Sequence, residues 1–273
     1  MKRFILTAMA IVMAASFMTG CATQQSRSRL DEIKEAGKIT MAVSPDFAPL
    51  EFVDPTKTGD ESYVGADIEL GRYIAEQLGV ELVIEAMDFT AVQAAVTMGS
   101  VDMAISGFSY TEERAENMLL SDYYNMDDED GQGILVLKTR ADEFKEAADF
   151  TGKLVGAQSA SLQYNLVTSQ LPEAEVEQIV NLNDAVMMLI TEKIDALAVD
   201  TDNGASFANN YDEIIMSDFY FDFSSEGNVL AVTKGETELM DAINEILAKV
   251  NEEGLFLEWR DDATALADSL GIE

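Results

Sequence analysis

The side chains of this 273-residue chain that could do chemistry are carboxylates, hydroxyls and a few cations, because histidine is absent and Cys21 is the only cysteine. Without histidine there is no Ser-His-Asp triad, no Cys-His nucleophile and no histidine-based metal site. One cysteine can form neither an internal disulfide nor a thiolate zinc site. We therefore expect no catalytic residues, no cofactor and no resident metal, and a chemistry of charge pairing and hydrogen bonding.

Two charged residues stand out as candidates for binding. Arg114 follows Glu112 and Glu113, and a run of charges of this kind usually faces water. Asp200 ends a predicted strand, where α/β folds place ligand-binding groups, although a lone aspartate in an acidic chain is usually a surface residue. The residue types alone leave both interpretations open.

The overall charge excludes one class of partner. Asp and Glu number 51 against 17 Lys and Arg, which gives a formal net charge of -34. Nucleic acid would be repelled at long range, so it is not expected as a ligand. Hydrophobic residues make up 48% of the chain, which is ordinary for a folded protein and too much for a disordered acidic one. The length suits roughly two domains of about 150 residues each.

An acidic run, Asp127-Asp128-Glu129-Asp130-Gly131, has the composition of a calcium-binding loop but not its spacing. With Gly131 at the sixth position of such a loop, the first position is Met126 and the twelfth is Leu137. Neither side chain can ligate calcium, so we do not expect a calcium site here.

The N-terminus has the pattern of an export signal. Lys2 and Arg3 precede an apolar run over residues 4–17, followed by Met18-Thr19-Gly20-Cys21. The apolar segment is shorter than the ~20 residues of a membrane-spanning helix, and small residues precede a cleavage point. These residues resemble a bacterial lipobox, which implies cleavage before Cys21 and a lipid on its sulfur. We expect residues 1–20 to be a signal peptide and residues 21–29 to be a polar tether.

Short apolar strands alternate with helices in the rest of the chain, which predicts an α/β protein with largely parallel sheets. Asp102 and Asp195 each stand at a helix-to-strand turn in two similar segments. The similarity of the two segments is either a coincidence of loop chemistry or an indication of two lobes, each with its own sheet. Strands are predicted over 38–44, 81–86, 102–106, 134–137, 154–157, 175–180, 196–199 and 228–232. Helices are predicted over 67–78 and 90–98, after Ser159, and over 183–191 with Asn183 as the cap. Two more are predicted within 236–270, separated at Gly254.

An ordered series of motifs covers residues 30–271. It comprises Asp46-Phe47-Ala48-Pro49 and the segments 64–68, 101–114, 121–124, 152–158, 194–200 and 227–235. Each motif is weak alone, but in this order and at these spacings the chain resembles family 3 of the extracellular solute-binding proteins, the amino-acid receptors of ABC importers.

The resemblance implies a two-lobed periplasmic-binding-protein fold of type II, in which each lobe is a mostly parallel sheet flanked by helices and two crossovers join the lobes. Lobe 1 would comprise residues 30–126 and 227–273, and lobe 2 residues 130–223. The implied function is that of a monomeric, lipid-anchored receptor outside the cytoplasmic membrane. It would close on an L-amino acid by hinge motion and deliver it to ABC permease subunits.

A receptor for a free amino acid must neutralise a carboxylate and an ammonium in a dry cleft, because burying either group unpaired costs several kcal/mol. The resemblance implies that Arg114 grips the carboxylate and that Asp200 pairs with the ammonium. It brings further residues to the cleft: Phe47 and Phe89 beside the ligand side chain, Ser106, Gly107 and Ser109 near the amine and carboxylate, Ser161 and Leu162 at a helix start that faces the carboxylate, and Gln158.

The chain departs from the family pattern at two places. Ala160-Ser161-Leu162 stands where the family commonly has a glycine and two hydroxyl residues, which removes one hydroxyl and keeps the backbone donors. Ser44 stands where many relatives have an aspartate that reads a basic or amide side chain. Together with Phe108, Gln158 and Val199, Ser44 predicts a ligand with a neutral side chain.

Two other functions remain open on sequence. The fold is also similar to that of periplasmic dehydratases of prephenate-like acids, which need a general acid beside the leaving group. The obvious cleft carboxylate, Asp200, is already assigned to the ligand amine, so we expect a binding protein and not an enzyme. A receptor for a dipeptide or a small amine is the other alternative.

Overall fold

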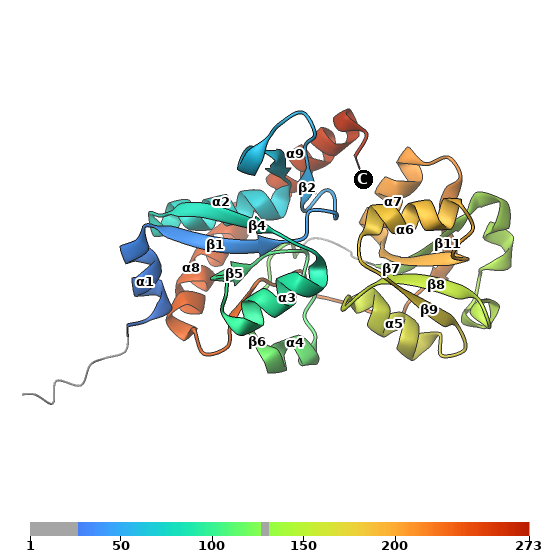
Figure 1. Cartoon of the computed structure of the whole chain (residues 1–273), viewed down its shortest axis with the longest axis horizontal. Coiled ribbons are helices and arrows are strands. Elements are labelled where there is room, and N and C mark those ends of the chain that lie inside the picture. The colour runs from blue at the N-terminus through green and yellow to red at the C-terminus, as the bar shows by residue number, and fades with distance from the viewer. Residues whose placement is uncertain (1–26, 127–130, 273) are drawn as a thin grey trace, which may run out of the picture.

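Two five-stranded sheets, each flanked by helices, form two lobes that lie side by side (Figure 1). This computed structural model describes residues 27–126 and 131–272. The predicted signal peptide, Cys21 and the acidic run 127–130 lie outside the described residues. Within the described ranges, no helix is both long and apolar enough to cross a membrane.

The first sheet has the strand order β4-β1-β5-β12-β6. β1 pairs in parallel with β4 and β5, whereas β12 is antiparallel to both β5 and β6. The strands are β1 (Lys38–Val43), β4 (Glu81–Ala86), β5 (Met103–Ala104), β6 (Met118–Leu120) and β12 (Ala231–Thr233), and the helices of this lobe are α1 (Arg29–Ala36), α2 (Ala66–Leu78), α3 (Phe89–Met98), α4 (Glu112–Asn117), α8 (Thr237–Glu253) and α9 (Leu255–Leu270).

Alternating side chains of β1 pack against different helices on the two faces of this sheet. Met41 and Val43 are fully buried in a cluster that includes Ile68 of α2, and Ala42 is buried on the opposite face with Val92 of α3. Each large apolar side chain buried in this way stabilises the lobe by about 1.5–3 kcal/mol. The packing holds the carboxyl end of β1, from which the candidate binding residues follow, in a fixed position.

The second sheet has the order β11-β7-β10-β8-β9. β8 is parallel to β9 and β10, and β7 is antiparallel to β10 and β11. Its elements are β7 (Gln132–Leu137), β8 (Leu154–Gln158), β9 (Glu175–Ile179), β10 (Ala196–Asp200), β11 (Ile214–Tyr220), α5 (Leu162–Gln170), α6 (Leu182–Ile190) and α7 (Thr201–Asn210).

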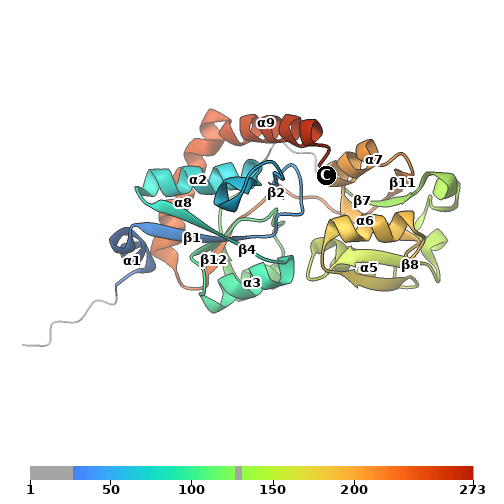
Figure 2. The ribbon, with the colours of Figure 1, turned by 45° about the horizontal axis from the view of Figure 1, so that its top comes forward.

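The second lobe has the same layered construction. Ile134 and Val136 of β7 pack with Leu166 of α5 on one face. Leu135 packs with Val186 of α6 on the other. Figure 2 shows α6 and α5 on opposite sides of this sheet, and α9 extending across the first lobe toward α7. Shorter elements are β2 (Phe52–Val53) and β3 (Tyr63–Val64), which pair with each other, and the 3-10 turns Gly59–Ser62, Lys138–Glu143 and Ala147–Phe150.

The structure confirms the predicted two-lobed α/β fold. It also contains elements that were not predicted, namely α1, β6, α7 and β11, and it differs from the predicted elements in further details. Both sheets are mixed, because the strands next to the crossovers, β7, β11 and β12, run against their neighbours. The last strand of the first lobe covers Ala231–Thr233 and not 228–232. The helix predicted to be capped by Asn183 begins at Leu182, because the Asn181 side chain accepts the backbone N–H of Asn183 and Asp184. The residue boundaries proposed for the lobes stay a prediction.

Candidate ligand-binding site

A pocket with about 480 Å³ of space between protein atoms lies between the two lobes. All ten residues predicted for ligand contact line it: Phe47, Phe89, Ser106, Gly107, Ser109, Arg114, Gln158, Ser161, Leu162 and Asp200. The wall also contains residues that the sequence did not indicate for binding: Asp46, Glu51, Gln163, Leu182, Ala198 and Asn203.

Arg114 is the cation of the pocket wall and is only 6% exposed. Thr111 caps α4 by accepting the backbone N–H of Arg114. The side chain then turns away from the neighbouring glutamates and donates to the carbonyl of Ser109 at 2.7 Å and to that of Ala160 at 3.4 Å. Its guanidinium carbon lies 5.5 Å and 5.1 Å from the ring centres of Phe89 and Phe108, where cation–π attraction favours the charge.

Burial lowers the pKa of Arg114 to about 10, and the nearby Glu113 opposes this shift. The guanidinium therefore stays charged at neutral pH, and its hydrogen bonds go to backbone carbonyls. A buried cation in this state is ready to pair with an anionic group of a ligand. Phe108, predicted near the ligand side chain, instead lies fully buried beneath the guanidinium.

Ser106 and Gly107 follow β5 at the floor of the pocket. The Ser106 hydroxyl accepts the backbone N–H of Ser44 at 3.0 Å and donates to Glu51 Oε1 at 2.7 Å. Gly107 has φ +55, and a Cβ at this position would approach a ring carbon of Phe47 to 2.9 Å. Glycine is therefore required both for the backbone conformation and for the close approach of Phe47.

Asp200 joins the pocket wall to the start of α7. Its Oδ1 accepts the backbone N–H of Asp202 at 3.0 Å, which caps the helix, and its Oδ2 accepts Gln132 Nε2 at 2.9 Å. Asn203, one turn into the helix, donates across the cleft to the carbonyl of Ala48 at 3.3 Å. The carboxylate is therefore fixed in orientation, at the carboxyl end of β10.

The second-lobe turn before α5 presents Ser161 as a helix cap. Its hydroxyl accepts the backbone N–H of Tyr164 at 3.1 Å, so that this hydroxyl already has a structural role. Ala160 adopts φ 59, the left-handed conformation that favours glycine. Its carbonyl accepts Gln93 Nε2 from the first lobe at 3.0 Å. Ala160, which stands where the family commonly has a glycine, thus adopts a backbone conformation that favours glycine.

Two carboxyl groups lie together at one side of the pocket, Glu51 in its wall and Asp67 behind it. Glu51 is 1% exposed and Asp67 is fully buried. Burial raises the pKa of Glu51 well above its usual range, and the adjacent Asp67 raises it further. Burial also raises the pKa of Asp67 to about 6, although hydrogen bonds from Gly107, Tyr124 and Glu51 act in the opposite direction. Within the pair, these shifts favour the proton on Glu51 and the negative charge on Asp67.

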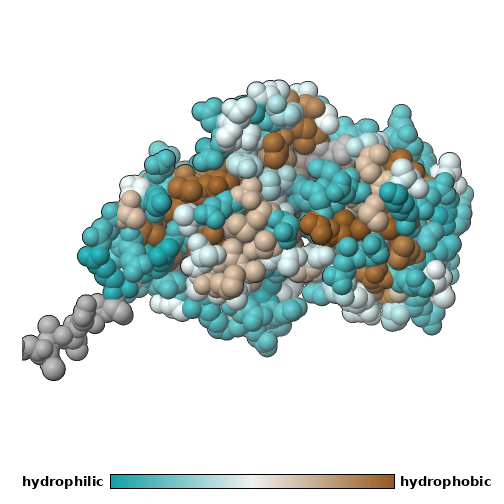
Figure 3. Space-filling view, viewed as in Figure 1, coloured by the Kyte–Doolittle hydropathy of each residue, from teal (hydrophilic) through white to brown (hydrophobic). Residues whose placement is uncertain are grey.

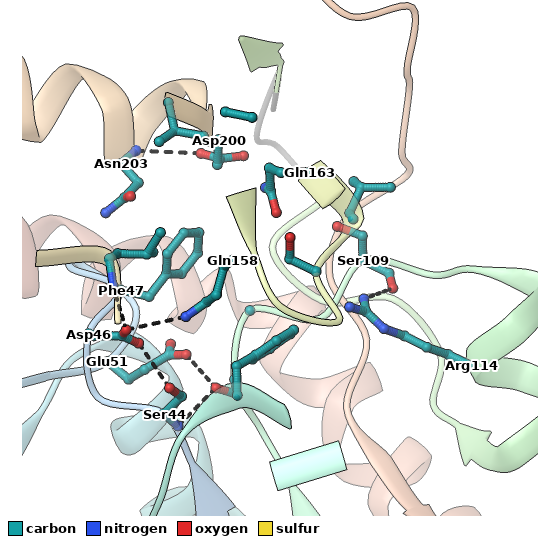
Figure 4. Close-up of a pocket in the computed structure, with 18 residues that line it drawn as sticks. Ser44, Asp46, Phe47, Glu51, Ser109, Arg114, Gln158, Gln163, Asp200 and Asn203 are labelled. Carbon is teal, nitrogen blue, oxygen red and sulfur yellow. Dashed lines mark hydrogen bonds between the residues drawn. The ribbon is translucent and has the colours of Figure 1, made fainter. Parts of the chain in front are cut away.

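Asp46 connects the lobes at the same end of the pocket. Its carboxylate accepts the Ser44 hydroxyl at 2.9 Å, Gln158 Nε2 at 3.2 Å and the backbone N–H of Leu182 at 3.0 Å. Burial raises its pKa despite these hydrogen bonds. Figure 4 shows Asp46, Glu51 and Ser44 together on one side of the pocket and Arg114 on the other.

Sequence reasoning missed Asp46, Glu51 and Asp67, and the last two had a signal. Glu51 stands between the buried Leu50 and Phe52, and Asp67 stands between the buried Ala66 and Ile68. An acidic residue between two apolar neighbours is thus the available signal, but it does not identify a buried carboxylate by itself, because Glu69 has the same setting and is exposed. Within the described residues no group of three or more His, Cys, Asp or Glu side chains is arranged to hold a metal ion.

Comparison with known proteins agrees with this geometry. The profile of the bacterial extracellular solute-binding proteins, family 3, matches residues 39–261. A probable histidine-binding protein of Campylobacter jejuni is 26% identical over 94% of this chain and 96% of its own. The arginine-binding extracellular protein ArtP of Bacillus subtilis is 26% identical over 93% and 94%. The crystal structure of the amino acid ABC transporter substrate-binding protein AbpA from Streptococcus pneumoniae, bound to L-arginine, superposes with a TM-score of 0.80 at 30% identity and covers 89% of this chain and 99% of that one.

Proposed function

Because the chain belongs to the bacterial extracellular solute-binding proteins of family 3, we propose that it is the substrate-binding component of an ABC importer and that it binds an L-amino acid with a cationic side chain, L-arginine above all. The ligand would occupy the pocket between the lobes. The histidine-binding protein and ArtP are named for basic amino acids, and AbpA contains bound L-arginine.

The observation that supports this ligand is the separation of charges in the pocket, with Arg114 on one side and Asp46 and Glu51 on the other (Figure 4). The α-carboxylate of arginine pairs with Arg114 and its ammonium with Asp200. Its guanidinium then reaches the carboxyl groups at the opposite wall, where burial strengthens the attraction. The sequence predicted a neutral side chain from Ser44 together with Phe108, Gln158 and Val199, but the two buried carboxyl groups beside Ser44 favour a cation.

An amide side chain, as in L-glutamine, is the second candidate, and one observation favours it. Asp46 already accepts three hydrogen bonds. Burial raises the pKa of Glu51 well above its usual range, which favours its protonated form. A protonated carboxyl group can exchange hydrogen bonds with a neutral amide without a net charge pairing. Affinities for arginine and glutamine therefore decide the side-chain class.

The setting of the protein is part of the proposal. We place it outside the cytoplasmic membrane, held there by a lipid on Cys21 and acting as a monomer that delivers its ligand to permease subunits. The support is the family to which it belongs, whose members are extracellular, together with the export-signal pattern of residues 1–21.

Binding without catalysis is the final element of the proposal. The relatives are named as binding proteins. Glu51, whose pKa is raised by burial, is the cleft carboxyl group that could serve as a general acid, but one of its oxygens accepts the Ser106 hydroxyl and Asp67 lies beside it. We therefore expect no turnover of prephenate or arogenate in an absorbance assay.

Calorimetric titration of ligand-stripped protein with each of the twenty amino acids tests the proposed function. We expect L-arginine to bind most tightly, with a Kd of about 1 μM or below, corresponding to about 8 kcal/mol. Absence of binding tighter than ~1 mM to any amino acid would exclude the amino-acid ligand, because that affinity is worth only about 4 kcal/mol. Preference for glutamine over arginine would favour the second candidate.

A further inference from the structure

Glu51 and Asp67 form a buried carboxyl pair, and the role that we infer for this pair rests on the proposed function. Glu51 extends from the loop after β1, and Asp67 from the first turn of α2. Glu51 lines the pocket, whereas Asp67 lies behind it without contact with the pocket surface. The two side chains are adjacent and both are removed from water.

The hydrogen bonds of the pair leave one oxygen of each side chain without a donor. Glu51 Oε1 accepts the Ser106 hydroxyl at 2.7 Å, and Asp67 Oδ2 accepts the Gly107 N–H at 2.8 Å and the Tyr124 hydroxyl at 3.2 Å. Glu51 Oε2 and Asp67 Oδ1 are buried and have no donor among the described residues. It is unfavourable for two adjacent buried carboxylates to be charged while each has an oxygen without a hydrogen-bond donor. A proton on one of the two oxygens provides the missing donor.

We propose that Glu51 and Asp67 share one proton in the unliganded protein, and that a cationic ligand side chain expels this proton to solvent whereas a neutral one leaves it in place. The proton is carried on a Glu51 oxygen and donated to Asp67. When a guanidinium enters, the O–H bond breaks, the proton goes to the buffer, and Glu51 becomes a carboxylate that accepts from the ligand. Charge balances, because the pocket loses one positive charge as it gains another.

The other groups around the pair favour a retained proton. Asp46, in the same loop as Glu51, adds a second negative charge that raises the pKa of Glu51. Tyr124, from the segment after β6, faces Asp67 with its hydroxyl as a neutral donor. The hydroxyl of Ser106 on Glu51 is a neutral donor too. Arg114, the cation of the pocket wall, lies on the opposite side (Figure 4).

This arrangement explains how one pocket can serve two classes of ligand. With the proton in place, the pair has one negative charge and Glu51 offers both a donor and an acceptor, which suits an amide. With the proton removed, the pair has two negative charges and suits a guanidinium. The affinity for a cationic ligand is therefore expected to rise with pH, by up to about tenfold per pH unit below the pKa of the pair.

Calorimetry in two buffers of different ionisation enthalpy, near pH 7, measures the protons exchanged on binding. L-arginine and L-citrulline are the probes, because the side chain of citrulline is neutral and has nearly the same shape. We expect about one proton to be released per arginine bound and about none per citrulline. Arginine binding with no proton release would overturn the proposal, whether or not citrulline binds.

Two variants assign the proton to this pair. Glu51→Gln removes the titrating group, so arginine should bind without proton release, and the ratio of arginine to citrulline affinity should fall by at least about tenfold. Glu69→Gln is the matched control, since Glu69 is an exposed carboxylate on α2, two residues from Asp67. It should retain both the wild-type proton release and the wild-type ratio. Unchanged release in Glu51→Gln would contradict the assignment.

The unliganded protein offers an independent test that needs no ligand. The infrared difference spectrum between wild type and Glu51→Gln at pH 7 should contain the carbonyl band of a protonated carboxyl group, present only in the wild type. Its absence would show that Glu51 is ionised and that no proton is shared. Failure of every amino acid to bind would instead contradict the proposed function, so the two failures are distinguishable.

Discussion

Arg114 has the properties required of a carboxylate-binding residue. The cation is buried, is positioned by two backbone carbonyls, and lies against the rings of Phe89 and Phe108. Its neighbours in sequence, Glu112 and Glu113, are exposed. The charge run therefore contains both exposed and buried residues, because the short helix α4 exposes one face and buries the other.

Arg114→Ala should abolish binding of amino acids. Truncating one partner of a buried, hydrogen-bonded charge pair costs about 2–5 kcal/mol of binding free energy, which is at least about 30-fold in Kd. Arg72→Ala is the control, because Arg72 is a more exposed arginine on α2 that bonds surface carbonyls. Calorimetric titration measures both. Retained affinity in Arg114→Ala, with a normal fold by circular dichroism, would show that the carboxylate lies elsewhere.

The predicted contact residues, which line the pocket, could be named because they lie in motifs, whereas the role of Asp46 depends on contacts between the lobes. Arg114, Asp200 and the small residues near Ser106 follow from their positions in ordered segments of the chain. The role of Asp46 emerges only when the second lobe packs against the first and brings Gln158 and Leu182 to its carboxylate. Such contacts depend on a three-dimensional arrangement that local sequence does not contain.

At the scale of elements, the two similar segments identified in the sequence have the same structural role. Asp102, before β5, accepts the backbone N–H of Thr40 at 2.7 Å and bonds Arg29. Asp195, before β10, accepts the backbone N–H of Leu154 at 2.9 Å and bonds Arg140. In each lobe an aspartate thus ties a helix-to-strand turn to the neighbouring parallel strand.

The turn between β8 and α5 contains a residue in an unfavourable backbone conformation. Ala160 has φ 59, where a Cβ is disfavoured relative to glycine. Ala160→Gly should therefore stabilise the protein by about 0.5–1 kcal/mol, the balance between relief of this strain and the greater entropy of unfolded glycine. Urea denaturation at equilibrium measures the change in the free energy of unfolding.

A matched control is Ala205→Gly, at an exposed position in the interior of α7. Because glycine is unfavourable within a helix, this substitution should destabilise the protein by roughly 0.5–1 kcal/mol. If Ala160→Gly destabilises to the same extent, the turn has no strain for glycine to relieve.

Element boundaries were the weaker part of the sequence prediction. The helices α2, α3, α8 and α9 were placed well, because each ends at a glycine in the left-handed conformation, at Gly79, Gly99, Gly254 and Gly271. The strand predicted over 228–232 begins later, at Ala231 of β12, because Asn228 pairs only through isolated bridges and residues 228–230 precede the paired strand. Local pattern shows that a segment is extended, whereas the sheet decides which residues pair.

At the scale of the whole molecule, the two lobes meet through hydrogen bonds around the pocket. Gln158 reaches Asp46, Asn203 reaches the carbonyl of Ala48, and Gln93 reaches that of Ala160. These are polar contacts at the pocket rim, as hinge closure around a ligand requires. The protein surface in Figure 3 is largely hydrophilic, as expected for a chain with a formal net charge of -34.

The unliganded protein should become more stable as the pH falls from about 7 to about 4.5, because the raised pKa values of Asp46, Glu51 and Asp67 favour the folded state when these groups are protonated. Their contribution is fully present below their ordinary pKa and is lost as the pH rises through the folded value, about 6 for Asp67. The lowered pKa values of Asp54, Asp142, Glu143, Asp149 and Asp195 act in the opposite direction, mainly at and below the acidic end of this window.

Reduced repulsion among the many carboxylates acts in the same direction as these buried groups. Urea denaturation at constant ionic strength should show a gain on the order of 2 kcal/mol in the free energy of unfolding between pH 7 and pH 4.5. The Glu51→Gln variant should show a smaller gain. A loss of stability over this range would contradict the assigned pKa directions.

A basic L-amino acid in this pocket should place its α-carboxylate on Arg114 and its side chain toward Asp46 and Glu51. A crystal structure of the protein with L-arginine tests this arrangement most directly. We expect a bidentate pair between the ligand carboxylate and Arg114, the ligand ammonium on Asp200, and the ligand guanidinium beside Glu51. A ligand bound in the reverse orientation, or outside the pocket between the lobes, would contradict the proposed binding mode.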